Sequence, residues 1–246
     1  MSYTNKVINI LYNEGPISLV RKGVPFLYDQ HIAKYLPPAT ASHNGVTVES
    51  AKIFDSKLPW REPNRPNVES GLVSHILEHV EEGDKVVIVG GGWGVTATKA
   101  AQKVGETGNV IVYEGSLEEV NKLEKTIDLN DVADIVDIRH CIVGPAVYLR
   151  GKPENAEIIH PSDLPECDIL ELDCEGAENE ILLKIDIEPR AILVETHGKY
   201  DSPSQLIENL LEDLGYQIDS KIVAEERKAE YCRNQDIYAI SAIRNV

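Results

Sequence analysis

Short apolar runs alternate with amphipathic stretches from residue 84 onward. Five runs rich in apolar, mostly β-branched residues lie at 86–89, 109–115, 132–144, 168–173 and 190–198. Such runs are typical of strands buried on both faces of a sheet. The stretches between them, for example 95–104 and 116–130, place apolar residues at helical spacing. Because strand and helix alternate, the pattern predicts a parallel sheet with helices on both faces.

The pattern changes near the C-terminus. Residues 216–225 and 235–244 alternate as two more strands, and residues 226–234 between them show no clear helical pattern. Two such strands pair most simply as an antiparallel hairpin at the sheet edge. We therefore expect an α/β fold with a mostly parallel seven-stranded sheet, helices on both faces and a C-terminal antiparallel hairpin. The core domain is expected to span residues 68–246.

Residues 1–67 form an expected accessory region. Residues 7–36 mix apolar and basic residues and predict one or two short amphipathic helices, broken near Gly15–Pro16 and Gly23–Pro25. This segment would either cap the core domain or contact a membrane or a membrane-bound partner. Residues 45–54 alternate like a strand or hairpin, and a proline-rich loop follows at 58–67.

A helix is expected at residues 68–82, and it carries His75 and His79 four residues apart. A metal pair needs a third ligand. The sequence pattern shows none, so the two histidines are expected at the surface or at its boundary. No metal site is assigned.

A glycine-rich turn follows the first core strand. Gly90, Gly92 and Gly94 form a G-x-G-x-G pattern, which is usual in enzymes that use S-adenosylmethionine. Gly92, Gly94 and Ala97 also fit the G-x-G-x-x-A pattern of dinucleotide-binding proteins. Glycines allow a tight turn and close approach of a ligand, and the helix beyond offers N–H groups. Strand, glycine turn and helix together predict a nucleotide site.

Polar side chains end the later strands. Glu114 is expected to accept hydrogen bonds from the ribose hydroxyls of an adenosine, 24 residues after Gly90. His140 and Cys141 end the third strand, at the edge that approaches the adenine in such folds. A core thiol and a boundary histidine are the alternative interpretation.

Three acids and a histidine are candidates for the chemistry. Asp173, Glu175 and Glu178 surround the end of the fourth strand, at the sheet edge where ligands bind. They could hold the methionine ammonium of the donor, orient a hydroxyl or bind a divalent cation. His197 leaves the fifth strand at the same edge, and its usual pKa suits a general base.

Composition narrows the classes of function. The net charge is −17, with 41 acidic and 24 basic residues spread along the chain. This charge disfavours a nucleic-acid partner, because the phosphates would be repelled. It also fits the high-salt cytoplasm of a halophilic organism. The four cysteines form no C-x-x-C pair and are expected to be reduced thiols. The sequence shows no apolar run of membrane-spanning length and no signal peptide, so a cytoplasmic location is expected.

The segments VVIVGGGWGVTAT, VYEGSLEEVNKLEKTIDLN and LELDCEGAENEIL resemble those of FkbM-type methyltransferases. The D-x-E-G-x-E pattern of Asp173, Glu175, Gly176 and Glu178 is the most specific part of the resemblance, which covers residues 68–200. The resemblance implies an S-adenosylmethionine-dependent O-methyltransferase that acts on a sugar or natural-product hydroxyl. The GGGWG turn departs from the family pattern, so Trp93 is expected to reshape the methionine end of the cofactor site.

The sequence thus predicts methyl transfer from S-adenosylmethionine to an oxygen of a small-molecule or glycan acceptor. His197 is the preferred base, with Asp173 or Glu175 next; a uronic-acid carboxylate as acceptor would need none. Two alternatives remain: an NAD-dependent sugar oxidoreductase, although the sequence lacks a clear second βαβαβ half, and a non-catalytic binding module. Pairing of sheet edges could produce a homodimer.

Overall fold

The computed structural model describes residues 3–145 and 152–244. The chain divides into two compact units: Met1–Ala41 with Glu49–Asn64, and Ser42–Val48 with Arg65–Val246. The larger unit begins three residues before the expected boundary at 68 and also includes residues 42–48, which the sequence pattern assigned to the accessory region.

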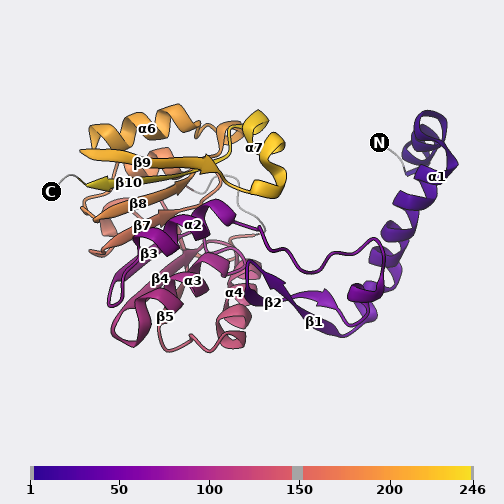
Figure 1. The fold of residues 1–246 in the computed structure, drawn as a ribbon, viewed down its shortest axis with the longest axis horizontal. Coiled ribbons are helices and arrows are strands. Elements are labelled where there is room, and N and C mark those ends of the chain that lie inside the picture. Colours follow the sequence, from indigo (N-terminus) through magenta and orange to yellow (C-terminus); the bar gives the residue numbers. More distant parts are fainter. Residues whose placement is uncertain (1–2, 146–151, 245–246) are drawn as a thin grey trace. The chain divides into compact units, whose positions relative to one another are not determined.

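The larger unit contains an eight-stranded sheet in the order β6-β5-β4-β3-β7-β8-β10-β9 (Figure 1). Its strands are β3 (Lys85–Val89), β4 (Asn109–Glu114), β5 (Val136–Val143), β6 (Glu157–Ile159), β7 (Ile169–Leu172), β8 (Ala191–Glu195), β9 (Tyr216–Val223) and β10 (Tyr238–Arg244). The pairs among β3 to β8 are parallel, and β10 is antiparallel to both β8 and β9. The expected antiparallel hairpin is therefore confirmed. The sheet has one strand more than expected, because β6 lies in a segment without clear periodicity.

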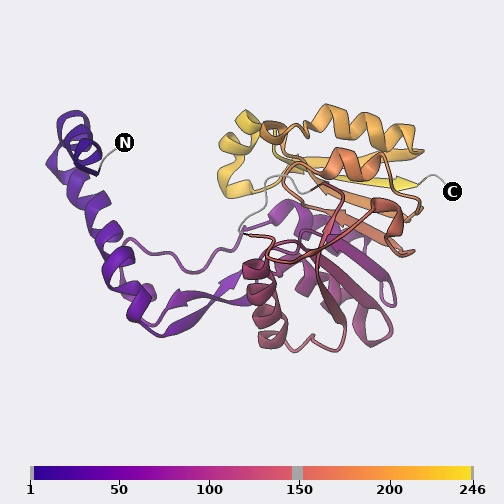
Figure 2. The same ribbon diagram turned by 180° about the vertical axis from the view of Figure 1, so that it is seen from behind.

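Helices cover both faces of this sheet, as expected (Figure 2). They are α2 (Ser70–His79), α3 (Val95–Val104), α4 (Leu117–Leu129), α5 (Glu178–Leu182), α6 (Ser204–Asp213) and α7 (Ala229–Gln235). The described residues also contain six short 3-10 turns, the first two of them in the smaller unit: Ala33–Tyr35, Asp55–Lys57, Gly105–Thr107, Pro161–Asp163, Gly198–Tyr200 and Glu226–Lys228. Helix α7 lies between β9 and β10, where the sequence pattern indicated no helix.

Two apolar cores lie on opposite faces of the sheet, because successive strand side chains point to opposite sides. Val86 and Ile88 of β3 pack with α2, α3 and α4, whereas Val87 and Val89 pack on the side of α5 and α6. All four side chains are buried. Burial on both faces explains why these strands are continuous apolar runs rather than alternating ones.

The carboxyl ends of the parallel strands meet at one edge of the sheet, and two of them approach closely. Gly90, directly after β3, has φ +96°, and a Cβ built there would lie 1.9 Å from the carbonyl oxygen of Asp173, directly after β7. No side chain fits in that space. Gly90 thus allows the turn after β3 and the loop after β7 to meet.

The smaller unit begins with α1 (Tyr3–His31), which is kinked at Gly15, where φ is 83° and ψ is 171°. The break expected near Gly15–Pro16 is confirmed, but the one near Gly23–Pro25 is wrong, because the helix continues through Pro25. The Tyr28 hydroxyl donates a hydrogen bond of 2.8 Å to Asp55. The strands β1 (Pro38–His43) and β2 (Val46–Lys52) form a two-stranded sheet. The alternation of residues 45–54 predicted only the second of them.

No helix in residues 3–145 and 152–244 combines the length and the apolar composition that crossing a membrane would require. Apolar side chains of α1, among them Ile17, Val20 and Leu27, are exposed. The contact between residues 7–36 and a membrane or membrane-bound partner therefore stays a prediction.

One expectation about α2 is wrong. His75 is only 1% exposed, because it lies on the face of α2 that packs against the sheet. Burial lowers the pKa of His75, so its ring is neutral at pH 7. His79, one turn further, is partly buried.

The approach of β3 to β7 leads to a first prediction. Replacing Gly90 by Ala should destabilise the fold by about 3 kcal/mol, because a new methyl group meets backbone at a positive φ. Gly92→Ala is the matched control: Gly92 also has a positive φ, but no atom lies within 4 Å of the position that a Cβ would take there, so only about 1 kcal/mol is expected. Urea unfolding of both variants measures the difference. Equal losses of stability would contradict the close approach.

Candidate functional site

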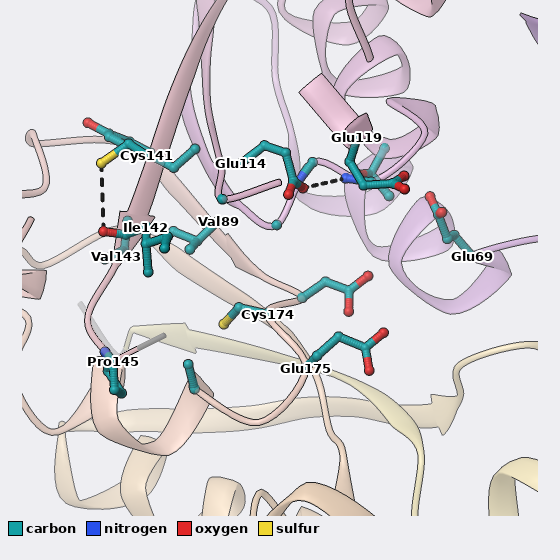
Figure 3. Close-up of a pocket in the computed structure, with 18 residues that line it drawn as sticks. Glu69, Val89, Glu114, Glu119, Cys141, Ile142, Val143, Pro145, Cys174 and Glu175 are labelled. Carbon is teal, nitrogen blue, oxygen red and sulfur yellow. Dashed lines mark hydrogen bonds between the residues drawn. The ribbon is translucent and has the colours of Figure 1, made fainter. Parts of the chain in front are cut away.

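A first cavity opens at the carboxyl edge of the sheet, above β3, β4, β5 and β7 (Figure 3). The space between its walls, including the part open to solvent, is about 770 Å³. It is lined by Glu69, Val89, Gly90, Gly91, Gly92, Thr96, Tyr113, Glu114, Gly115, Glu119, Cys141, Ile142, Val143, Pro145, Asp173, Cys174, Glu175 and Ala177. Its walls thus combine apolar side chains, a glycine turn and several carboxylates.

The Glu114 carboxylate holds the glycine turn in place. Its Oε2 accepts hydrogen bonds from the amides of Gly91 and Gly92, at 3.0 and 3.1 Å, and its Oε1 accepts one of 2.8 Å from the amide of Ser116. Burial raises the pKa of Glu114, and these hydrogen bonds oppose that rise. The sequence pattern predicts that the turn amides and Glu114 each face a ligand. In the structure they bond to one another, and Oε1 keeps capacity for one further donor.

Three of the residues expected around a cofactor do not line this cavity. Trp93 lies beside His43 and Lys122 instead. Gly94 ends the turn as the N-cap of α3, and a Cβ there would lie 2.5 Å from Leu123, so its role is in packing. His140 belongs to the opposite face of β5, since strand side chains alternate and Ile138 packs on that face. Gly90, Gly92, Glu114, Cys141 and Asp173 do line it.

A second cavity of about 1630 Å³, which includes space open to solvent, lies beside the first. Its lining residues are Arg65, Val68, Glu69, Trp93, Asp173, Glu175, Glu195, His197, Lys199, Tyr200, Ala224, Glu225, Lys228, Tyr231, Cys232, Gln235 and Ile237. Three of these, Glu69, Asp173 and Glu175, also line the first cavity. The two cavities therefore meet at the loop after β7.

His197 is a buried imidazolium surrounded by carboxylates. Its Nδ1 lies 2.9 Å from Glu178, and its Nε2 lies 3.6 Å from Asp173, 3.7 Å from Glu195 and 4.0 Å from Glu175. Burial alone would lower the pKa of His197, but the hydrogen bond to Glu178 and the charges of Asp173, Glu178 and Glu195 outweigh it and raise the pKa to about 10. His197 is therefore protonated at pH 7, which argues against the expected role as general base.

Glu178 explains the shape of the loop that precedes it. Its Oε1 also accepts a hydrogen bond of 3.1 Å from the Cys174 amide, and its Oε2 accepts one of 2.9 Å from the Gly176 amide. Glu175 and Gly176 both have positive φ, and a Cβ on Gly176 would lie 2.5 Å from the Tyr200 carbonyl oxygen. Burial alone would raise the pKa of Glu178. The hydrogen bond to His197 and the charge of His197 outweigh this effect and lower the pKa below its usual value, so the carboxyl is ionised. The last acid of the D-x-E-G-x-E pattern, Glu178, thus forms a buried ion pair with His197. The first two acids, Asp173 and Glu175, line both cavities.

The same geometry bears on a metal. Asp173, Glu195 and His197 each present one ligand atom, and these atoms lie within 4.8 Å of one another. The protonated ring of His197 already supplies positive charge to these oxygens, so a cation would have to displace its proton.

Sequence reasoning missed Glu171 of β7, which is close enough to Asp173 for the charge of Asp173 to raise its pKa. Glu171 is fully buried. Burial raises the pKa of Glu171 to about 8, and the Thr96 hydroxyl lowers it by a smaller amount. Glu171 is thus mostly uncharged at pH 7. The only sequence signal for a buried acid at this position is a single carboxyl inside an otherwise apolar strand.

The other lining residues that sequence reasoning missed have diverse origins. Gly91 and Cys174 adjoin residues that the sequence predicted, and Glu69 follows directly after the first residue of the predicted helix. The second cavity brings Tyr231 and Lys228 from the segment between β9 and β10, for which the pattern predicted no element.

Comparison with known proteins supports the fold. No family model matches the sequence, and no curated protein matches it. An S-adenosylmethionine-dependent O-methyltransferase from Thermotoga maritima is similar in structure, with 15% identity and a TM-score of 0.50 over 72% of this chain and 65% of that one. The match thus spans less than two thirds of that chain. A ribosomal protein L11 methylase from Lactobacillus delbrueckii subsp. bulgaricus shows 16% identity and a TM-score of 0.50, over 72% and 79%. The expected Rossmann-like class I methyltransferase fold is confirmed.

The buried Glu171 predicts a pH dependence. Because folding raises its pKa from the usual 4.5 to about 8, the folded state binds more protons, and stability falls as the pH rises through this window. The loss between pH 4.5 and 7 is roughly 3 kcal/mol. Glu171→Gln keeps the shape without the charge, so it should remove this slope and be the more stable protein at pH 8. Urea unfolding from pH 5 to 9 measures both chains, and parallel curves would contradict the assignment.

Proposed function

We propose that this chain is an S-adenosylmethionine-dependent O-methyltransferase. The observation that carries the proposal is the junction of two cavities at Asp173 and Glu175. Transfer of a group requires donor and acceptor to meet in a fixed geometry. A glycine-turn cavity for an adenosine and a wider cavity for the acceptor, with a common wall, provide that arrangement.

The residues of the first cavity fit the donor. Gly92 leaves open the space that a Cβ would take, since no atom lies within 4 Å of that position, and Cys141, Ile142 and Val143 provide a wall for an adenine. Glu114 is placed to accept a ribose hydroxyl on Oε1. Asp173 and Glu175 offer negative charge for an ammonium and a sulfonium. When bound, S-adenosylmethionine supplies an activated methyl group, and the protein's task is to align the acceptor oxygen with it.

On the acceptor side, we assign the proton transfer to a carboxylate. Asp173 takes the proton of the acceptor hydroxyl on one of its oxygens, with Glu175 and Glu195 nearby. His197 does not act as the base. Its positive charge positions Asp173 and stabilises the ionised form of the Asp173 carboxyl in a partly buried site. A uronic-acid carboxylate would enter without any proton transfer.

We further propose a sugar or glycan acceptor, in line with the resemblance to FkbM-type enzymes. Three features of the second cavity support it: the aromatic side chains of Trp93, Tyr200 and Tyr231, the carboxylates that can accept hydroxyl hydrogens, and the basic Arg65, Lys199 and Lys228. Aromatic faces suit the apolar faces of sugar rings. The basic residues would favour an acceptor with an acidic substituent.

Donor binding can be tested by calorimetry. We expect S-adenosylmethionine to bind and NAD to give no heat. Glu114→Gln should weaken the binding by about 10- to 100-fold, because an amide NH₂ can face the amides of the glycine turn and leave them unpaired. Glu118→Gln, on the exposed side of α4, is the matched control and should leave the affinity unchanged. Preference for NAD, or equal affinities of the two variants, would contradict the proposal; tight donor binding without any turnover would favour a non-catalytic module.

The assignment of the proton transfer predicts how two variants differ. Asp173→Asn should lower kcat by about 100-fold or more, because the proton acceptor is lost. His197→Gln should move the acidic limb of the pH–rate profile to higher pH, since the carboxylates lose a neighbouring positive charge. The assay follows S-adenosylhomocysteine formation with a panel of neutral and acidic sugars.

Glu180→Gln, an exposed change in the first turn of α5, is the control for these measurements. The wild-type enzyme should be fully active at pH 7–8, where His197 is protonated. Activity that appears only near pH 10 would instead restore His197 as the base.

A further inference from the structure

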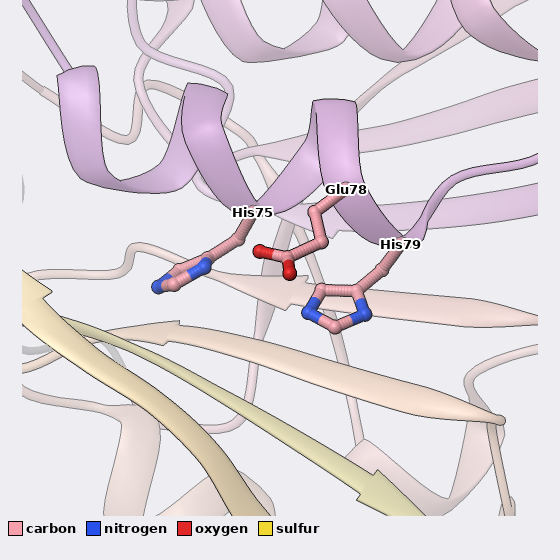
Figure 4. A group of neighbouring side chains, drawn as sticks. All are labelled: His75, Glu78 and His79. Carbon is pink, nitrogen blue, oxygen red and sulfur yellow. The ribbon is translucent and has the colours of Figure 1, made fainter.

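Helix α2 brings together three side chains that neither cavity uses. His75, Glu78 and His79 each present one possible ligand atom, and these atoms lie within 4.8 Å of one another. Figure 4 shows the Glu78 carboxylate between the two imidazole rings. The spacings of three and four residues place all three on one face of the helix. The sequence pattern revealed only the pair of histidines, and the structure adds Glu78 as the third group.

His75 is oriented as a metal ligand would be. Its Nε2 lies 3.3 Å from the carbonyl oxygen of Ala239 in β10. A carbonyl can only accept a hydrogen bond, so Nε2 carries the hydrogen and Nδ1 keeps its lone pair. This Nδ1 is buried and has no hydrogen-bond partner within the part of the chain that the structure describes. Leaving a buried acceptor unsatisfied is costly, and a bound cation would satisfy it.

His79 lies close to a carboxylate. Its Nε2 is 3.5 Å from the carboxylate of Asp219 in β9 and makes no hydrogen bond within the described residues. Glu78 and Asp219 together supply two negative charges close to the two rings. The group therefore favours a divalent cation on charge as well as on ligand type.

We propose that His75, Glu78 and His79 bind a Zn²⁺ ion. Two imidazole nitrogens and one carboxylate oxygen form a donor set that suits Zn²⁺, with a fourth position left for water. Tetrahedral bonds of about 2.0–2.2 Å bring ligand atoms to about 3.4 Å of one another. The ligand atoms must therefore close by up to about 1.4 Å on binding, and the exposed Glu78 can contribute by rotating its side chain.

The role of this ion would be structural. None of its three ligands lines either cavity, so the site is independent of the proposed methyl transfer. The ion would stabilise the last turn of α2. Helix α2 packs against β10 and β8. The residue before α2, Glu69, lines both cavities, so a firmer α2 also supports their common wall.

The test is a titration of the metal-free full-length chain with Zn²⁺ alone and with Co²⁺ alone. One equivalent should bind, and Co²⁺ should give the intense visible absorption of a four-coordinate site. His79→Gln should weaken the affinity by at least about 100-fold, and Glu78→Gln by about 10-fold. His75 is left intact because its burial makes misfolding a second explanation. Circular dichroism confirms that both variants are folded.

Two control variants assign the ion to this site. His31→Gln removes an exposed histidine of the smaller unit, and Glu195→Gln alters the carboxylate group around His197; both should retain the wild-type affinity. The proposal is overturned if His79→Gln binds Zn²⁺ as well as the wild type does. It is equally overturned if only Glu195→Gln loses binding, or if the wild type binds no more tightly than about 100 μM.

Discussion

The close approach of two backbone segments determines the rest of the site. The carbonyl of Asp173 occupies the space that a side chain on residue 90 would need. This contact brings the glycine turn after β3 against the loop after β7, so that both cavities share a wall. A single missing Cβ therefore lets the two cavities meet.

Charge is the second constraint, because several acids gather where water is scarce. The site tolerates them in three ways. Glu171 is kept uncharged by burial, Glu178 is ionised through its contact with His197, and Asp173 and Glu175 face open space. The His197 imidazolium is the common counter-ion. An unpaired buried carboxylate would cost several kcal/mol, so the protonation of this one ring decides how much negative charge the site can hold.

Much of the fold could be predicted from local patterns. The continuous apolar strands, the helices between them and the antiparallel end of the sheet depend on periodicity, which is a local property. Ser116 is of a residue type that commonly caps helices, and its hydroxyl accepts a hydrogen bond from the Glu119 amide at the start of α4. The short strand β6 and helix α7 were missed. Both lie in segments of seven residues or fewer, whose structure depends on tertiary contacts that periodicity does not show.

The site was predicted less completely, because side-chain partners are not local. The sequence placed Asp173, Glu175 and His197 at one sheet edge but did not indicate that His197 would be protonated, nor that Glu114 would bond to the glycine turn itself. The meeting of the two cavities at Asp173, on which the proposed methyl transfer depends, is tested most directly by a crystal structure with S-adenosylhomocysteine. We expect the adenosine between Glu114 and Cys141, with the sulfur beside Asp173 and facing the second cavity. Binding with the sulfur directed away from that wall, or at another surface, would contradict it.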